Sequence, residues 1–278
     1  MAWNANGLLQ YRQELQAVLD TEKVGVCLVS ETHFTKQSYI KFRGYKAYHT
    51  IHPENSAKEG SAVIINENIH HHEETKYEIE GIQATTIHIK ARNCSIVVAG
   101  IYCPPKHSLK KYEYLEFLGR MGNRFIVGGN FNAKNTHWSS RLTTTKGREL
   151  LRAIQKTRCE AMSTGKPTYW PTDLGKIPDL IDFFIIKNIP AQYLHIEKNH
   201  DFNSDHTPIH LTLSQNIIQK ENNPVLVNRR TEWESFRQSL EEKINLMVPL
   251  TLRRLMSYIY GAPILDVSRS HTTTQHSR

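Results

Sequence analysis

The 278-residue sequence lacks several features that would assign it to a broad class of protein. It has no apolar run of the roughly 18 residues that a membrane-spanning helix needs, so no membrane contact is expected. It begins without a basic segment followed by an apolar stretch, which predicts that it carries no secretory signal. No block of like charge is strong enough to be named a dedicated nucleic-acid arm.

Cysteine is also scarce, and the four cysteines show no short paired spacing: Cys27, Cys94, Cys103 and Cys159. A zinc site or a disulfide framework is therefore unsupported, and a reducing intracellular compartment fits better. The hydrophobic content of 39% predicts a folded core rather than a disordered chain. The net charge of +8 favours a polyanionic partner such as nucleic acid, although many basic proteins bind none.

The chain is organised around one run, Arg124–Asn135, which reads RFIVGGNFNAKN. Phe125–Gly128 predicts a buried strand, and the two glycines allow a tight turn at its end. The alternative is a strand-end turn that is rich in asparagine because asparagine tolerates turn geometry. Four polar residues follow the glycines within a short span: Asn130, Asn132, Lys134 and Asn135.

Apolar and alternating stretches predict further strands along the chain. These are Val24–Val29, Ser61–Ile65, Gln83–Ile89, Ser95–Tyr102, Pro178–Ile186 and Ile209–Leu213, with Pro167–Pro171 as a short aromatic strand. The strand before Trp3 has only Met1 and Ala2, so we expect a short first strand. Helical spacing of apolar residues predicts helices over residues 8–19 and 146–157. Strands at short intervals with few helices predict a two-sheet sandwich with helices outside it.

Polar residues fall at the ends of several predicted strands, and polar groups that converge on one rim of a rigid fold make a site. They are Asn4, Asn6, Glu31, Tyr102, Asn130, Asn132, Asp182, Asp205 and His206. Glu31 alone is either a surface residue or a metal ligand. Asp182 lies within an apolar stretch, where a carboxylate is costly unless it is paired. His70–His72 are interpreted as a solvated loop rather than a metal site, because adjacent histidines do not share a helix face.

Seven motifs run in order from residue 1 to about residue 214: WNANG, SETH, IYCPP, GGNFNA, PTYWP, PDLIDFFI and SDHTP. In this order they resemble the endonuclease/exonuclease/phosphatase superfamily, and within it the apurinic-type endonuclease domain of jockey-like non-LTR retrotransposons. The resemblance implies a DNase I-like α/β fold, a four-layer sandwich of two mostly antiparallel sheets flanked by helices. It also implies double-stranded DNA as partner, a nuclear location, and a magnesium ion, with manganese as the alternative metal. In such elements the enzyme nicks chromosomal DNA, and the new 3′-hydroxyl primes reverse transcription.

The resemblance further implies which residues bind metal and phosphate. Glu31 would be the main magnesium ligand, assisted by Asn4, and Asp205 would lie near the metal. Oxygen donors of this kind suit a hard cation that keeps several waters. Tyr102 would contact the phosphate, and Asn132 would orient it or support the metal shell.

Two further residues would act together on the phosphate. His206 would hydrogen-bond a non-bridging oxygen, and Asp182 would hold the imidazole in one tautomer. The remaining matches are the positions expected to face DNA: Asn6, Asn135, Trp138, Thr168, Trp170 and Ser204.

One position departs from the family pattern, which reads GGDFNA where this chain has Asn130. The family aspartate is assigned to aligning or activating the attacking water, and an amide cannot accept that proton. We therefore predict a poor or inactive nuclease that partly retains metal and DNA binding. The alternative is a catalytically dead remnant or a domesticated module that binds nucleic acid or protein. A third reading changes the substrate to RNA or an inositol phosphate, and the PTYWP segment argues against it.

Beyond residue 214 the composition changes. We expect a nuclease domain over 1–214, a linker over 215–230, an amphipathic helix over 231–248 and a disordered tail over 249–278. The helix resembles the connector between nuclease and polymerase in jockey-like polyproteins. Its apolar stripe is either ordinary core or a face for a protein partner. The sequence leaves the oligomeric state open.

Overall fold

The computed structural model describes residues 1–90, 95–173, 175–198, 202–214, 216–218, 232–235 and 237–238. The chain divides into two compact units, Met1–Gln219 and Lys220–Arg278. In the second unit, residues 233–235 and 237–238 are helical, while the rest of the predicted 231–248 helix and the 249–278 tail lie outside the described residues. The predicted domain boundaries stay predictions. Among the described residues, no helix combines the length and apolar character needed to cross a membrane.

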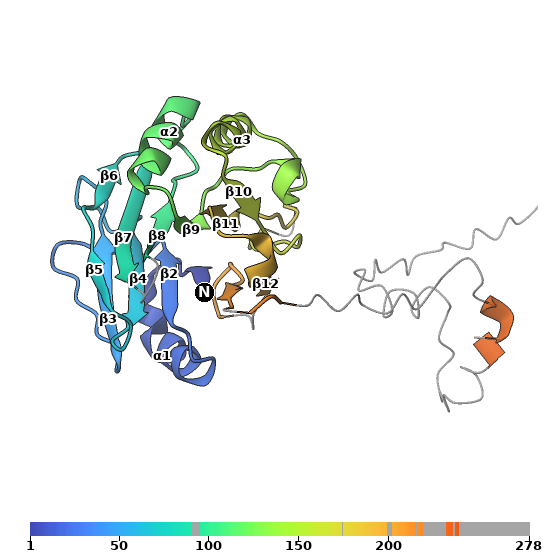
Figure 1. The fold of residues 1–278 in the computed structure, drawn as a ribbon, viewed down its shortest axis with the longest axis horizontal. Helices are drawn as coiled ribbons and strands as arrows, with labels where there is room; N and C mark the ends of the chain where they lie inside the picture. The colour runs from blue at the N-terminus through green and yellow to red at the C-terminus, as the bar shows by residue number, and fades with distance from the viewer. Residues whose placement is uncertain are drawn as a thin grey trace, which may run out of the picture. The chain divides into compact units, whose positions relative to one another are not determined.

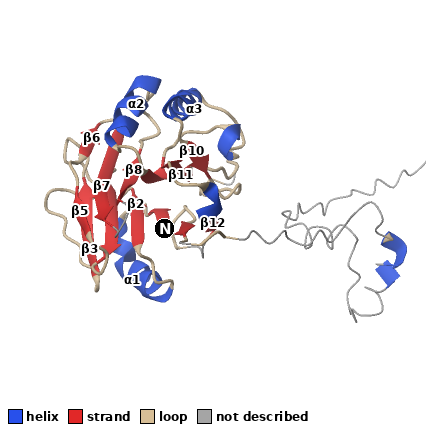
Figure 2. Cartoon of the chain, in the orientation of Figure 1, coloured by secondary structure: helices blue, strands red, loops and turns tan. Residues whose placement is uncertain are grey.

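The first unit contains two sheets packed face to face, with helices outside them (Figures 1 and 2). The six-stranded sheet has the order β12 (Leu194–Lys198), β13 (Ile209–Leu213), β1 (Ala2–Asn4), β2 (Val26–Ser30), β4 (Ser61–Asn66) and β3 (Tyr45–Thr50). The seven-stranded sheet has the order β10 (Glu160–Met162), β11 (Asp182–Lys187), β9 (Phe125–Asn130), β8 (Ser95–Tyr102), β7 (Ile82–Lys90) and β5 (His71–Glu73), with β6 (Tyr77–Ile79) also paired to β7. Two pairs are parallel, β1 with β2 and β8 with β9.

Three apolar clusters separate the layers. One lies between the two sheets, one between the six-stranded sheet and α1 (Arg12–Thr21), and one between the seven-stranded sheet and helices α2 (Lys111–Arg120) and α3 (Thr145–Thr157). Short 3₁₀ turns complete the structure at η1 (Leu8–Tyr11), η2 (Thr136–Trp138) and η3 (Ala191–Tyr193). The predicted four-layer α/β sandwich is confirmed.

The apolar runs in the sequence arise because the central strands are buried on both faces. In β9, Ile126 faces the cluster between the sheets, while Phe125 and Val127 belong to the cluster under the helices. In β2, Leu28 and Val29 divide in the same way between the inter-sheet cluster and the cluster under α1. Successive side chains of one strand therefore pack into two different apolar clusters.

The two central glycines lie inside β9 rather than after it, which corrects the predicted end of this strand at Gly128. A Cβ atom on Gly128 would come within 2.5 Å of the Phe184 ring. A Cβ on Gly129, whose φ is +144°, would come within 2.2 Å of the Ile101 carbonyl oxygen. Both positions require glycine because neighbouring strands and side chains approach too closely.

Three further predictions need correction. The strand predicted from Pro178 begins only at Asp182, so this carboxylate stands at a strand end rather than inside the strand. The Pro167–Pro171 segment makes isolated bridges through Tyr169 rather than a strand. His71–Glu73 forms the edge strand β5 rather than a loop, because it pairs with β7.

Candidate active site

Three residues predicted for the site stand side by side in the seven-stranded sheet. Tyr102 ends β8 and is paired in register with Asn130, which ends β9. Asp182 begins the antiparallel strand β11 and is paired with Asn130 from the other side. The register alone thus places three polar side chains in one row across the end of the sheet, and all three are buried.

The six-stranded sheet contributes Asn4 and Glu31 to the same rim. Asn4 ends β1 and pairs with Ser30, the last residue of the parallel strand β2, which Glu31 follows directly. The two sheets are tied together here by Ser30, whose hydroxyl donates to the Ile101 carbonyl at 2.8 Å and accepts from the Asn130 amide at 3.0 Å. Ser30 is a positioning residue, and its only signal in the sequence is its place directly before Glu31.

The Glu31 carboxylate is held by a set of hydrogen-bond donors. The Asn4 side-chain amide donates to Oε1 at 2.9 Å, the Tyr102 hydroxyl also donates to this carboxylate, and His33 Nε2 lies 3.9 Å from Oε2. Burial by itself would raise the pKa of Glu31, but these hydrogen bonds from His33, Asn4 and Tyr102 and the charge of His206 lower it. Glu31 is therefore an ionised carboxylate beside a buried tyrosine, whose own pKa is raised by burial and by the Glu31 charge.

The backbone is unusual at three residues of this rim. Asn6, Glu31 and Asn132 have φ values of +44°, +52° and +45°. Asparagine tolerates this left-handed region, whereas glutamate seldom adopts it. Such conformations persist only where surrounding structure enforces them, and they gather at functional sites.

Asp182 and His206 form a buried pair. His206 Nδ1 lies 2.7 Å from Asp182 Oδ2, and the Thr168 hydroxyl donates to the same oxygen at 2.8 Å. Burial would lower the pKa of His206, but the charges of Asp182, Asp205 and Glu31 and the hydrogen bond to Asp182 raise it. The raised pKa favours the protonated imidazole, whose Nδ1 is directed at Asp182.

Only the oxygen of the Asn130 carboxamide has a hydrogen-bond partner among the described residues. Its Oδ1 accepts a hydrogen bond from the Asn132 backbone amide at 2.8 Å. Its Nδ2 is buried and finds no hydrogen-bond partner among the described residues. Asp205 reaches the rim from the other sheet, where its Oδ1 accepts from the Asn6 side chain at 3.4 Å. The structure therefore brings together the predicted residues Asn4, Asn6, Glu31, Tyr102, Asn130, Asn132, Asp182, Asp205 and His206.

A supporting network lies behind this rim and was missed by the sequence reasoning. Asp179 is buried, forms an ion pair with Lys134 at 3.0 Å and accepts from the Arg141 backbone amide at 2.8 Å. Burial would raise the pKa of Asp179, but these bonds lower it. In the sequence, the only sign of this network is that Asp179 is the first aspartate of the PDLID motif. Its contacts join the loop after β9 to the segment before β11.

Lys146 fixes the exit of β8 from the other side. It lies in the first turn of α3, is buried, and donates to the Cys103 and Pro104 carbonyls at 3.1 and 2.6 Å. Burial lowers the pKa of Lys146. These bonds hold the backbone directly after Tyr102, so α3 helps to set the position of the tyrosine.

Several residues predicted to face DNA are not on the surface. Trp138 is only 1% exposed, stacks on Phe183 and donates to the Ala133 carbonyl, so the prediction of DNA contact is wrong for it. Asn135 is buried because its side chain caps η2 through the His137 amide, and Thr168 is buried as the partner of Asp182. Both act inside the fold, and neither is available to DNA.

The other DNA-facing predictions have different outcomes. Ser204 binds to β1: its hydroxyl donates to the Asn4 carbonyl at 3.1 Å and accepts from the Trp3 indole at 3.0 Å. Trp170 is 45% exposed beside the rim, where its indole donates to the Thr207 hydroxyl and Lys198 Nζ lies 5.5 Å from its ring centre. Trp170 and Asn6 keep the exposure that a DNA contact needs, and their role stays a prediction.

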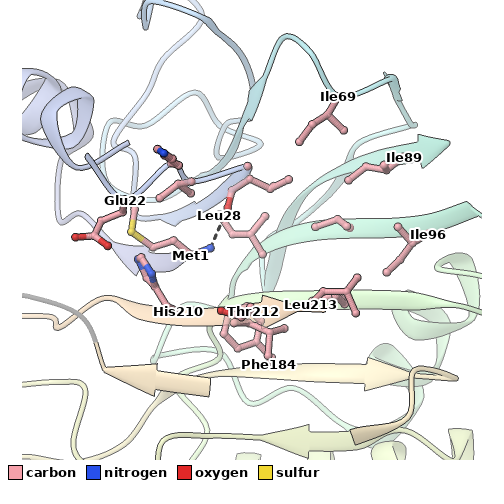
Figure 3. A pocket seen from close by; sticks show the side chains of 17 residues that line it. Met1, Glu22, Leu28, Ile69, Ile89, Ile96, Phe184, His210, Thr212 and Leu213 are labelled. Carbon is pink, nitrogen blue, oxygen red and sulfur yellow. Dashed lines mark hydrogen bonds between the residues drawn. The ribbon is translucent and has the colours of Figure 1, made fainter. Parts of the chain in front are cut away.

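A separate cavity of about 530 Å³ lies between the sheets, lined mainly by apolar side chains (Figure 3). Its lining includes Val26, Ile96 and Ile126, which stand at the beginnings of β2, β8 and β9. Tyr102 and Asn130 stand at the opposite ends of these strands. The cavity is therefore distinct from the polar rim.

The four-layer arrangement is shared with solved structures of nucleases. Among solved structures, the endonuclease domain of TRAS1, a telomere-specific non-LTR retrotransposon, aligns with a TM-score of 0.61 and 19% identity over 76% of this chain and 97% of that one. The AP endonuclease LMAP from Leishmania major aligns with a TM-score of 0.64 and 13% identity over 77% of this chain and 87% of that one. These likenesses show the shared fold.

Comparison with protein sequences identifies one matching family model and several relatives from mobile elements. Residues 96–210 match the endonuclease-reverse transcriptase family model. The RNA-directed DNA polymerase from mobile element jockey of Drosophila funebris is 28% identical over 88% of this chain and 27% of that protein. The probable RNA-directed DNA polymerase from transposon BS of Drosophila melanogaster is 27% identical over 90% of this chain and 28% of that protein. The chain is similar to these two polymerases and to the endonuclease-reverse transcriptase family, and it spans about a quarter of the length of the two polymerases.

Proposed function

We propose that the rim around Glu31 binds a magnesium ion and the phosphate backbone of double-stranded DNA, and that the chain hydrolyses the phosphodiester poorly because of Asn130. The observation that carries the proposal is the convergence of Glu31, Tyr102, Asp182 and His206 at one end of the sandwich. Glu31 and His206 reach this place from the six-stranded sheet, and Tyr102 and Asp182 reach it from the seven-stranded sheet.

The donor set at this rim suits a hard cation. Glu31, Asn4 and Asp205 offer carboxylate and amide oxygens, the ligand type that Mg²⁺ and Mn²⁺ prefer. The lowered pKa of Glu31 keeps the negative charge that such an ion requires. When bound, the ion would stabilise negative charge on phosphate oxygens.

The chain's own residues complete the phosphate site. Because His206 Nδ1 is bound to Asp182, its Nε2–H is the donor left for a non-bridging phosphate oxygen. Tyr102 has a raised pKa and therefore stays a neutral hydroxyl, whose one proton can turn from Glu31 to a phosphate oxygen once a cation binds Glu31. Asn130 can hydrogen-bond the attacking water but cannot accept its proton, so the general-base contribution is missing.

Glu31→Gln should abolish the thermal stabilisation that Mg²⁺ gives the protein, because the neutral amide offers no charge to the cation. We expect Mg²⁺ at tenfold its dissociation constant to raise the melting temperature of the parent protein by roughly 3–6 °C and that of the variant by less than about 1 °C. Differential scanning calorimetry with and without Mg²⁺ measures both shifts. Glu14→Gln on α1 is the matched control and should keep the full shift. An equal shift in all three proteins would place the ion elsewhere.

Trp170→Ala should weaken binding to a DNA duplex by roughly 5- to 150-fold, which corresponds to the stacking contribution of about 1–3 kcal/mol for an aromatic side chain. Fluorescence anisotropy at fixed salt measures the affinity. Tyr112→Ala on α2 removes another aromatic side chain that is 68% exposed and should leave the affinity unchanged. Equal affinities for the parent protein and Trp170→Ala would remove this residue from the interface.

The second candidate function is a binding module without catalysis, and Asn130 is the observation that favours it. If this second candidate is right, the protein should bind DNA without nicking it, and Asn130→Asp should not nick DNA either. The plasmid-nicking comparison argued in the Discussion separates the two candidates.

A further inference from the structure

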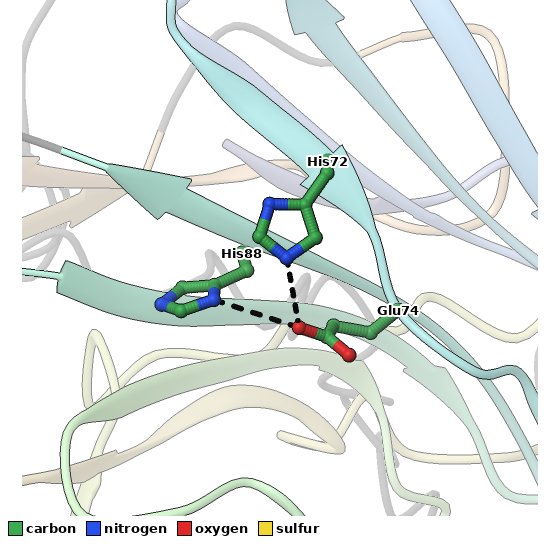
Figure 4. Close-up of side chains that lie close together, drawn as sticks. All are labelled: His72, Glu74 and His88. Atoms are coloured by element: carbon green, nitrogen blue, oxygen red, sulfur yellow. Dashed lines mark hydrogen bonds and ion pairs between the residues drawn. The ribbon is translucent and has the colours of Figure 1, made fainter.

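A cluster of three potential metal ligands lies away from the rim, at the edge of the seven-stranded sheet (Figure 4). His72 belongs to the edge strand β5, Glu74 follows that strand, and His88 lies on β7. Their ligand atoms all lie within 4.8 Å of one another. The ring nitrogens of both histidines point toward the same carboxylate in Figure 4. Nothing in the proposed nuclease chemistry uses these residues.

The backbone builds this cluster before any ligand arrives. His72 and His88 are direct cross-strand partners, so their side chains emerge on the same face of the sheet. The Glu74 backbone amide donates to the Thr86 carbonyl at 2.9 Å, which fixes the carboxylate beside them. The preceding histidine, His71, points to the other face, where its Nε2 lies 3.0 Å from the Tyr48 hydroxyl. The alternation of a strand therefore sends His72 alone toward His88.

We propose that His72, Glu74 and His88 form a second metal site, selective for a transition-metal dication such as Zn²⁺. Glu74 Oε1 lies 3.2 Å from His72 Nε2 and 3.5 Å from His88 Nδ1. Ligand bonds of about 2.0–2.1 Å in a tetrahedron place neighbouring ligand atoms about 3.3–3.4 Å apart. The two measured separations lie on either side of that length. Two imidazoles with one carboxylate are a zinc donor set, and they leave one position for water.

The exposure of the three side chains allows an ion to enter. The side chains of His72, Glu74 and His88 are 47%, 43% and 25% exposed. Because the ligands come from β5 and β7, a bound ion would join the short edge strand to the strand beside it. A bound ion would thus stabilise the edge strand β5, which has only three residues to pair with β7. Mg²⁺ prefers oxygen ligands and would not compete here.

The test is isothermal titration of the full chain with ZnCl₂ in buffer that contains saturating Mg²⁺, which occupies the Glu31 rim. We expect one zinc ion per chain at this site. His72→Gln and His88→Gln should each weaken zinc binding by at least about tenfold. His70→Gln removes a histidine from the same segment, and Glu31→Gln removes the main oxygen ligand of the rim. Both should bind zinc as the parent protein does.

A second measurement distinguishes loss of the zinc site from poor folding of a variant. Zinc at 100-fold its dissociation constant should raise the melting temperature of the parent protein and of His70→Gln by roughly 5–10 °C, and should not raise that of Glu74→Gln. Circular dichroism without zinc should be the same for all variants. Absence of zinc binding, equal affinity in parent and His88→Gln, or loss of binding in Glu31→Gln alone would each overturn the proposal. The nuclease site is assayed separately with Mg²⁺, so failure of the zinc proposal leaves the proposed nuclease function standing.

Discussion

Replacing Asn130 by aspartate should raise the rate of Mg²⁺-dependent plasmid nicking by roughly 10²–10⁴-fold, the contribution of a positioned general base. Asn130 Oδ1 already accepts a hydrogen bond from the Asn132 amide, and an aspartate oxygen would keep that bond. The second aspartate oxygen would take the place of Nδ2, which has no partner among the described residues. The substitution thus adds basicity with little change in shape. Conversion of supercoiled plasmid to open circles measures the rate.

The matched control is Asn135→Asp, which makes the same chemical change five residues after Asn130, the last residue of β9. The Asn135 side chain caps η2 through the His137 amide, and aspartate is an equally good cap. This variant should therefore nick as slowly as the parent protein. Adding Glu31→Gln to Asn130→Asp should remove the gain, because the base then acts without the main metal ligand.

The outcomes separate the two candidate functions. Equal and robust nicking by the parent protein and Asn130→Asp would refute the prediction that Asn130 impairs the enzyme. Inactivity of both proteins, with duplex binding intact, would favour the binding module. A gain in Asn135→Asp as large as that in Asn130→Asp would show that added negative charge, rather than a base at one position, is responsible.

Much of the fold was predictable because its central strands are buried on both faces. Such strands appear in the sequence as short apolar runs, and Ser95–Tyr102 was predicted with the bounds that the structure has. Ile209–Leu213 was also predicted with its observed bounds, from the alternation of its side chains rather than from burial on both faces. The same runs located the rim, since Tyr102 and Asn130 stand where the apolar residues stop. Weakly apolar elements were missed: the edge strands β3 and β12 and the helix α2 lack a run or stripe strong enough to stand out.

What the sequence could not show is which loop residues are buried. Trp138 and Thr168 belong to loops rich in polar residues, yet contacts with Phe183 and Asp182 from a distant strand bury them. Asp179 and Ser30 look like ordinary polar residues, and their importance comes from partners brought by the tertiary fold. The His72–His88 pair was missed for a related reason. His71 and His72 lie on a strand rather than a helix, so the alternation of the strand decides which side chains meet.

The loop that follows Asn132 depends on one glycine in α3, so Gly147→Ala should destabilise the protein by about 3 kcal/mol. A Cβ atom at Gly147 would lie 1.8 Å from the Lys134 carbonyl oxygen and 2.6 Å from its carbon. Both are backbone atoms, which cannot turn away as a side chain can. The loop would have to move, and Lys134 would lose the hydrogen bond that its carbonyl accepts from Thr144 and its ion pair with Asp179. Urea unfolding measures the free-energy change.

Gly119→Ala is the matched control, because Gly119 also lies in a helix, α2, and a Cβ there meets nothing within 4 Å among the described residues. Alanine gains roughly 0.5–1 kcal/mol over glycine in a helix, so this variant should be more stable than the parent protein. Replacing glycine by alanine should therefore lower the free energy of unfolding in α3 and raise it in α2. In the Asn130→Asp background, Gly147→Ala should also slow nicking, whereas Gly119→Ala should not. If Gly147→Ala unfolds within about 0.5 kcal/mol of the parent protein, α3 does not hold this loop against the rim.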